Sequence, residues 1–371
     1  MTPVLDETRK PANPFVAVRH LMIMGSALFF VLLVSTLLLV CQNAGLIRER
    51  LFHEFNKQQL LLARQVAARI QAHLLDIEME MKSLKRLNAG APGRDVLIEA
   101  MHGVVQRTRS KGLMEIGLMN SEGQIVEVHD IGVTETVTQR QIASDCTWDE
   151  SGGMVLGPLK VAAHTPKEST ITSMLCTRIS FDEYPVGVMF AWLDVSRLVK
   201  SVTGEIRSAK TGYAWVADET GLFLYYPTQD SVGKDALAAE KEQRPYINVD
   251  QGNRIIKEQM LRGEEGTGTY VSGWHRGIQG EMTKLIAFTP VRSAALSSGQ
   301  VWSVAVVAPT SEVAESVRRI HTRPLAAAGT LIAGMCVVGC MAIVYHRRHV
   351  QTLKAQEKHS KATPHDKKRG K

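Results

Sequence analysis

Apolar and polar residues alternate in different ways at the ends and in the middle of this 371-residue chain. Residues 21–41 and 325–345 are uncharged, largely apolar stretches of 21 residues each. At about 1.5 Å of rise per residue, a helix of this length spans the roughly 30 Å hydrocarbon core of a bilayer. The pattern predicts two transmembrane helices, with about 280 residues between them on one side of the membrane.

A long helix is predicted directly after the first apolar stretch, because residues 46–87 contain neither Gly nor Pro. Its apolar residues recur at spacings of three and four. They are Leu62, Val66, Ile70, Leu74, Ile77, Met81 and Leu84. We therefore expect a stalk over residues 42–93 that continues the first membrane helix. The stripe would pack either against the globular region or against a second copy of the helix.

The middle of the chain predicts an α+β fold made of two similar units, 94–206 and 207–310. Each would begin with a hairpin about a Gly-containing turn and continue, after a connecting segment, with three further strands. The strands expected are 113–120, 124–130, 154–163, 170–180 and 186–193 in the first unit, and 213–217, 222–226, 267–272, 284–289 and 301–308 in the second. Helices are expected at 94–109 and 195–206. The shared plan indicates a structural duplication.

Residues 311–324 predict a juxtamembrane helix, kinked or broken at Pro324 where it enters the second apolar stretch. The charge is concentrated at the ends of the chain. The tail 346–371 has a formal charge of +7, equal to that of the whole chain, and segment 1–20 is weakly basic. Lys and Arg beside both spans predict cytoplasmic termini, an inner-membrane location and a periplasmic or extracytoplasmic middle. Because the middle is close to neutral, nucleic-acid binding is not expected.

Cys146 and Cys176 are the two cysteines of the predicted exterior region. An oxidising compartment permits a disulfide between them, which would stabilise the fold by about 3 to 4 kcal/mol in the chain-entropy model. Two buried free thiols are the alternative. The sequence has neither a CxxC pair for zinc nor a CxxCH motif for haem, so no metal or cofactor is expected.

The sequence gives no sign of catalysis. Its histidines are scattered without HExxH spacing, and neither a GxSxG elbow nor a phosphate-binding loop occurs. We therefore expect a protein that is not an enzyme.

Residues 210–235, KTGYAWVADETGLFLYYPTQDSVGKD, resemble the signature hairpin of Cache domains. Downstream, GEEGTGTYVSGW, KLIAFTPV and VWSVAVVAPTSEV resemble the closing strands of the same domain, and YPVGVMFAWLDVSRLVKSV resembles the end of a membrane-distal unit. The resemblance implies a double Cache sensor over about residues 46–320. Its two PAS-like units would lie on the stalk helix and bind a small ligand in the distal unit.

Many Cache relatives recognise amino acids through an Arg-x-Trp-Tyr cluster and an Asp after the last strand. Asp194 matches that Asp, and Arg140 stands for the Arg, but Trp148 lies too far from Arg140 and no Trp-Tyr pair occurs. Asp194 would accept from a ligand ammonium, Arg140 would bind a carboxylate, and Trp148 would form a pocket wall. The ordinary alternatives are a helix N-cap, a solvated loop residue and a core tryptophan, respectively.

In the second unit, the family's His-Pro is replaced by Tyr226-Pro227. Tyr213, Tyr225 and Tyr226 would line a second pocket or simply build the hairpin.

These features predict a membrane-anchored sensor that relays ligand binding to a separate partner, such as a histidine kinase or chemoreceptor, because no output motif follows Tyr345. A homodimer is a further expectation. The alternatives are an extracytoplasmic scaffold that binds a protein or an envelope component, or the remnant of a truncated receptor.

Overall fold

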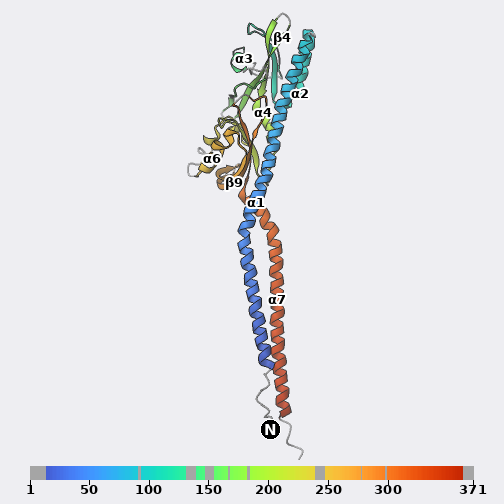
Figure 1. Cartoon of the computed structure of the whole chain (residues 1–371), viewed down its shortest axis with the longest axis vertical. Coiled ribbons are helices and arrows are strands. Elements are labelled where there is room, and N and C mark those ends of the chain that lie inside the picture. The colour runs from blue at the N-terminus through green and yellow to red at the C-terminus, as the bar shows by residue number, and fades with distance from the viewer. Residues whose placement is uncertain are drawn as a thin grey trace, which may run out of the picture. The chain divides into compact units, whose positions relative to one another are not determined.

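The computed structural model describes residues 14–90, 93–130, 139–146, 154–165, 168–181, 184–238, 247–276, 278–296 and 299–361. The chain divides into two compact units, Met1–Ser311 and Glu312–Lys371. The first unit holds both sheets and the long helix α1, and the second consists of most of α7 (Figure 1).

Helix α1 (Pro14–Ala89) joins the first apolar stretch and the predicted stalk in one continuous helix. Six of the seven residues of the predicted stripe are at most 2 % exposed, so the stripe packs against the globular region. Leu62 is the exception, since it is only partly buried and the neighbouring Ala63 is fully buried. We call this buried row the inner stripe of α1.

The first sheet is antiparallel, with strand order β2-β1-β5-β4-β3. Its strands are β1 (Leu113–Met119), β2 (Ile125–Asp130), β3 (Lys160–Thr165), β4 (Glu168–Phe181) and β5 (Tyr184–Asp194). The helices around it are α2 (Arg94–Thr108), η1 (Arg109–Lys111), α3 (Gln139–Asp145) and α4 (Val195–Thr203).

The second sheet repeats this order as β7-β6-β10-β9-β8. Its strands are β6 (Tyr213–Ala217), β7 (Phe223–Tyr225), β8 (Gly266–His275), β9 (Ile278–Val291) and β10 (Trp302–Pro309). The helices η2 (Gln229–Ser231), α6 (Asp250–Glu258) and η3 (Met260–Arg262) accompany it. The α+β fold with antiparallel sheets is as predicted, and both sheets place their last strand beside their first.

Each sheet has a near face, which packs toward α1, and a far face on its other side. One continuous apolar core joins the inner stripe to the near faces of both sheets, including Ile116, Leu193, Val216 and Val304. The far faces carry two separate clusters. Successive side chains of a strand alternate between the faces, so each strand contributes to the shared core and to its own far-face cluster.

The sequence prediction was wrong at one strand. Residues 154–163 were expected as one strand, but β3 begins at Lys160, and Leu156 forms an isolated bridge to Leu175. Pro158 lacks the N–H that a strand ladder needs. At Pro324 the sequence predicts a kink or a break, and of these two the break does not occur, because α7 (Thr310–Lys361) is one continuous helix.

Within the described residues, no helix has a run both long and apolar enough to cross a membrane. Most side chains of residues 21–41, and several of residues 325–345, lie outside the described set.

An ion pair links α1 to Glu265, the residue directly before β8. Arg64 donates to Glu265 from Nε at 2.8 Å and from Nη2 at 2.5 Å, and Thr289 also donates to Glu265. The hydrogen bonds from Arg64 lower the pKa of Glu265 from 4.5 to about 2.

Acid should therefore weaken this contact. Because the folded pKa of Glu265 is depressed, its stabilisation is complete above the unfolded pKa and is lost as the pH falls from about 4.5 toward about 2. Both side chains are partly exposed, so we expect a loss of about 1 kcal/mol or less. Denaturant unfolding at pH 7 and pH 3 should show a smaller pH dependence for Glu265→Gln than for the unchanged protein. Equal pH dependence would contradict the assignment.

Candidate functional site

The far face of the first sheet is an apolar surface covered by the short helix α3. Residues from three neighbouring strands form it together with one residue of α3. They are Met114, Met119, Met174, Cys176, Phe190, Trp192 and Ile142, all at most 9 % exposed. Methionine and aromatic side chains give such a surface adaptable, polarisable contacts.

A carboxyl group of β1 is buried on this face. Glu115 of β1 is fully buried and pairs in register with Trp192 of β5, so both side chains lie on the same side of the sheet. Burying an ionised carboxylate is costly unless a donor or a cation is close to it. Glu115 and Trp192 thus combine a carboxyl group with an aromatic ring, a pairing suited to a cationic or hydrogen-bond-donating ligand group. Sequence reasoning missed both, although a single acid in the apolar strand LMEIGLM was a visible signal.

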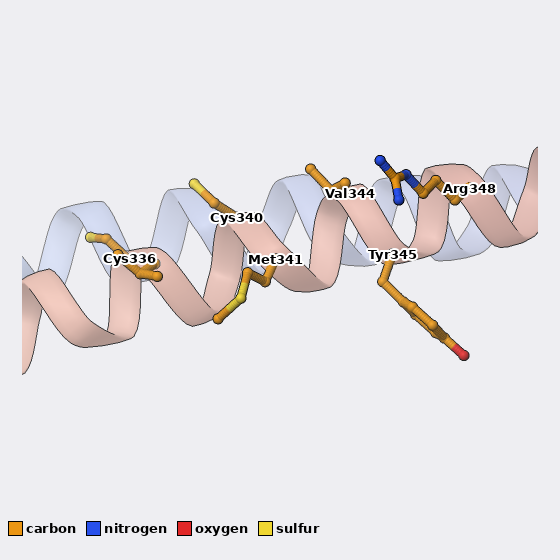
Figure 2. Close-up of a pocket in the computed structure, with 7 residues that line it drawn as sticks. Cys336, Cys340, Met341, Val344, Tyr345 and Arg348 are labelled. Atoms are coloured by element: carbon orange, nitrogen blue, oxygen red, sulfur yellow. The ribbon is translucent and has the colours of Figure 1, made fainter.

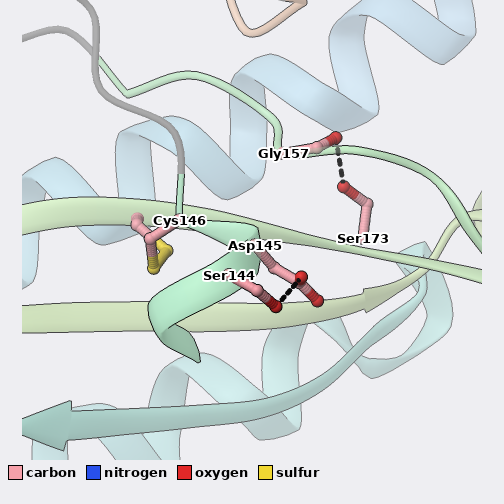
Figure 3. The surroundings of a disulfide bond; sticks show 6 residues. Ser144, Asp145, Cys146, Gly157 and Ser173 are labelled. Atoms are coloured by element: carbon pink, nitrogen blue, oxygen red, sulfur yellow. Dashed lines mark hydrogen bonds between the residues drawn. A yellow bond between two sulfur atoms is a disulfide. The ribbon is translucent and has the colours of Figure 1, made fainter. Parts of the chain in front are cut away.

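A disulfide and an ion pair fix α3 over this face. Cys146, directly after α3, is bonded to Cys176 of β4 with the two Cα atoms 5.5 Å apart. Asp145 forms an ion pair with Lys160 of β3 at 2.5 Å. The Ser144 hydroxyl donates a hydrogen bond to the Asp145 carboxylate (Figure 3). A helix of seven residues is unstable by itself, so these links hold it in place.

The segment before β3 ties this region to the second sheet. Gly157 donates its N–H to the Met174 carbonyl at 2.7 Å, and its own carbonyl accepts from Ser173 Oγ at 2.8 Å. The Gly157 carbonyl also accepts from Gln300 Nε2 at 3.1 Å, and the Leu156 N–H donates to the Ala295 carbonyl. Because Gln300 lies just before β10, which leads into α7, this segment connects the first sheet to the strand that precedes α7.

The predicted ligand residues occupy different environments. Arg140 is exposed in the first turn of α3, and Trp148 lies outside the described residues. Asp194 is buried at the start of α4, where it accepts from the Arg197 N–H at 2.8 Å and lies 3.4 Å from Arg197 Nε. The structure thus gives Asp194 the geometry of a helix N-cap, the structural alternative that the sequence had left open.

Replacing Asp194 should separate its capping role from a role in binding. Asp194→Ala should lower the free energy of unfolding by about 1 kcal/mol, whereas Asp194→Asn should keep the cap and most of the stability. Chemical denaturation measures both variants. If Asp194→Asn is as unstable as Asp194→Ala, capping is not its contribution. If Asp194→Asn keeps stability but loses ligand binding, Asp194 contacts the ligand.

The far face of the second sheet is more polar. Lys284 is fully buried there and donates from Nζ to Tyr213 Oη at 3.3 Å, to Ser272 Oγ at 3.1 Å and to the Trp274 carbonyl. The Tyr213 and Tyr226 hydroxyls are 3.1 Å apart, and the rings of Tyr213, Tyr226 and Trp274 contact one another. The structure therefore brings Tyr213 and Tyr226 together next to the buried Lys284, in a polar cluster inside the unit.

Tyr225 does not join this cluster. It lies in the near-face core, and burial raises the pKa of its hydroxyl. Successive residues of a strand point to opposite faces, which separates Tyr225 from Tyr226. Lys284, the residue that organises the cluster, was not singled out from the sequence.

An exposed face of α7 carries free thiols. Figure 2 shows Cys336, Cys340, Met341, Val344 and Tyr345 on α7. Every lining residue comes from this one helix, so the surface is an exposed helix face and not an enclosed pocket. Among the residues that the structure describes, no group of three or more His, Cys, Asp and Glu side chains is arranged to hold a metal ion.

Comparison with known proteins identifies one family. A family model described as a Cache domain matches residues 45–317. No curated protein sequence matches the chain.

Several solved structures resemble this one at low identity. The ligand-binding domain of the amino acid chemoreceptor PctB from Pseudomonas aeruginosa PAO1, bound to L-Arg, is 14 % identical over 69 % of this chain and 96 % of its own, with a TM-score of 0.46. The periplasmic sensory domain of the Campylobacter jejuni chemoreceptor Tlp1 is 12 % identical over 69 % and 95 %, with a TM-score of 0.48. The extracellular domain of the putative histidine kinase mmHK1S-Z3 is 15 % identical over 73 % and 98 %, with a TM-score of 0.46.

Proposed function

This chain belongs to the Cache domain family, and on that premise we propose that it is a membrane-anchored sensor that binds a small molecule outside the cytoplasm. The observation that carries the proposal is the far face of the first sheet, where buried Glu115 and Trp192 lie on the side that α3 covers. The two sheets correspond to a distal Cache unit, residues 94–206, and a proximal one, residues 207–310.

The proposed ligand carries a cationic or hydrogen-bond-donating group. That group would lie at Glu115, with the ring of Trp192 beside it. Arg140, exposed on α3, would contact an acidic substituent at the rim. Ligand discrimination would come chiefly from Glu115, because a carboxyl group among apolar side chains can form a hydrogen bond with a donor group of the ligand.

The membrane anchor rests on the sequence. Residues 21–41 and 325–345 are uncharged and long enough to span a bilayer, and the basic residues beside them support our proposal that both termini are cytoplasmic. Alkaline carbonate extraction of membranes should leave the full chain in the pellet. Protease added outside intact spheroplasts should cleave the middle of the chain and spare both ends. Release into the supernatant would contradict the anchor.

The signal would leave through α1 and α7. α1 packs against both sheets, and β10 leads into α7 at Thr310. A ligand that binds one arrangement of α3 more tightly than another would shift that equilibrium, and the bonds of Gly157 would carry the shift to the residues before β10. We propose that a separate partner, such as a histidine kinase, receives the signal in the membrane.

Thermal unfolding of the purified full chain with amines, amino acids, carboxylates and purines tests the ligand site. A ligand at 100 times its dissociation constant should add about 2.7 kcal/mol to the free energy of unfolding. Glu115→Gln should abolish the shift produced by a hit. Glu122→Gln, at an exposed hairpin position, is the matched control.

If no compound raises the unfolding temperature, the chain is better explained as a protein-binding scaffold. If Glu115→Gln behaves like the control, the ligand does not lie at Glu115.

A further inference from the structure

The polar cluster on the far face of the second sheet gathers several hydrogen-bond donors. Lys284 Nζ lies 3.3 Å from Tyr213 Oη and 3.1 Å from Ser272 Oγ. The hydroxyl of Tyr226 lies 3.1 Å from that of Tyr213. Amino and phenol groups both donate hydrogen bonds, which an anion accepts. We call the residues of this region the lysine cluster: Lys284, Tyr213, Tyr226, Ser272, Trp274 and Arg276.

An arginine lies beside the same tyrosine ring. The guanidinium carbon of Arg276 is 5.7 Å from the centre of the Tyr213 ring, and Lys284 Nζ is 5.5 Å from that centre. Arg276 is exposed, whereas Lys284 is fully buried. An anion near this ring is therefore attracted by the permanent charge of Arg276, and it favours the protonated form of Lys284.

Aromatic side chains connect the buried lysine with the surface of the unit. Tyr226 and Trp274 are only partly buried, whereas Tyr213 is 2 % exposed. The ring centre of Tyr226 is 5.8 Å from that of Tyr213 and 5.6 Å from that of Trp274. An apolar surface with a few polar groups at its inner end is typical of small-molecule binding sites.

We propose that the lysine cluster binds a small organic carboxylate as a second ligand. Its carboxylate group accepts hydrogen bonds from Lys284 and Tyr213, and its apolar part contacts Tyr226 and Trp274. The protonated amino group of Lys284 balances the single charge of a carboxylate, whereas a phosphate group carries about two charges near neutral pH. The lysine cluster lies on the second sheet, so this proposal is independent of the ligand site at Glu115 on the first sheet.

The lysine cluster adjoins the start of α7. Lys284 pairs in register with Pro309, the last residue of β10. Thr310, the first residue of α7, donates from Oγ1 to the carbonyl of Thr283 at 3.1 Å. A carboxylate at Lys284 therefore lies next to the residues where the chain leaves the second sheet. Its binding would favour the arrangement of this junction for which it has the higher affinity.

Calorimetric titration of the purified full chain with acetate, propanoate and benzoate tests the proposal. Benzoate should bind most tightly, because its ring adds contact with Tyr226 and Trp274. Lys284→Met, which keeps a long apolar side chain, should abolish this binding. Lys257→Met, at an exposed lysine of α6, is the matched control and should bind benzoate as the unchanged protein does.

Three results of these titrations would overturn the proposal. The first is that none of the three carboxylates binds. The second is that inorganic phosphate binds and the carboxylates do not, since the ligand would then belong to another class of anion. The third is that Lys284→Met and Lys257→Met have the same affinity for benzoate.

Tyr226→Phe provides a test that leaves the buried lysine in place. The loss of one hydroxyl group from the wall of the site should raise the dissociation constant for benzoate about tenfold. Tyr225→Phe is the matched control, because Tyr225 lies in the near-face core, and it should leave the constant unchanged. Equal constants for the two variants would place the ligand away from the lysine cluster. This pair decides the proposal even where Lys284→Met fails to fold.

The two proposed ligand sites are distinguished on the same samples. Glu115→Gln should keep benzoate binding, and Lys284→Met should keep the thermal shift that an amine produces through Glu115. Benzoate binding without a thermal shift from any amine or amino acid rejects the site at Glu115 alone. A shift from an amine without binding of any carboxylate rejects the lysine cluster alone. Loss of benzoate binding in Glu115→Gln would contradict a separate second site.

Discussion

Replacing Gly157 with alanine should lower the free energy of unfolding by about 3 kcal/mol, at the upper end of what overpacking costs. A Cβ atom at this position would lie 2.0 Å from the carbonyl oxygen of Asp145, the last residue of α3. Backbone has to move to make room, and Gly157 is also bonded to Met174, Ser173 and Gln300. We expect α3 to be displaced from the far face of the first sheet, so any ligand bound there should be lost as well.

Gly103→Ala is the matched control for this change. A Cβ at Gly103 of α2 would meet only the flexible end of Arg107, at 3.1 Å. Alanine is the better helix former by about 1 kcal/mol, so this variant should be as stable as the unchanged protein or more so. Urea unfolding of the two variants provides the measurement. If both have the same midpoint, the contact between Gly157 and Asp145 does not constrain the fold.

Removing the disulfide should have a similarly large effect. The double variant Cys146→Ala and Cys176→Ala should lose about 3 to 4 kcal/mol in the chain-entropy model, because the bond closes a loop with a sequence separation of 30. The region around α3 should be the most destabilised, because α3 then keeps the ion pair between Asp145 and Lys160 but not its covalent link to β4. Ligand affinity should fall along with stability.

The free cysteines of α7 supply the control for the disulfide. Cys336→Ala with Cys340→Ala replaces the same number of cysteines at exposed positions and should leave the unfolding midpoint of the sheets unchanged. Reducing agent should lower the midpoint of this control and of the unchanged protein but not that of the Cys146→Ala and Cys176→Ala variant. A loss below about 1 kcal/mol in that variant would argue against a stabilising bond.

Periodic segments of the fold were the predictable ones. The spacing of Val66, Ile70, Leu74 and Ile77 identified both the helix and its buried side, because a helical period of 3.6 leaves one row of side chains facing the core. The strands about the Ser121–Gly123 turn were equally clear. Residues 154–159 were misread because an apolar stretch looks like a strand even where a proline removes a ladder hydrogen bond.

The candidate site was less predictable than the fold. Arg140 and Asp194 were chosen by resemblance, and the structure shows an exposed residue and a helix cap. Glu115 and Trp192 are 77 positions apart in the sequence and meet only because β1 and β5 are neighbours. Lys284 likewise acquires its partners Tyr213 and Ser272 from two other strands. Pairings of this kind depend on strand order, which local patterns do not contain.

By itself, the sequence determined the family, the α+β class, the long helix with its inner stripe, and which two cysteines belong to the region between the apolar stretches. These follow from local periodicity and from short motifs, each contained in a few neighbouring residues. Only the tertiary structure decided that β1 and β5 bring Glu115 beside Trp192, that Gly157 lies against Asp145, and that Leu61, Leu75 and Met79 remain exposed on α1. The reason is that burial and contacts between distant residues depend on how all helices and strands pack together, which no short segment of the sequence specifies.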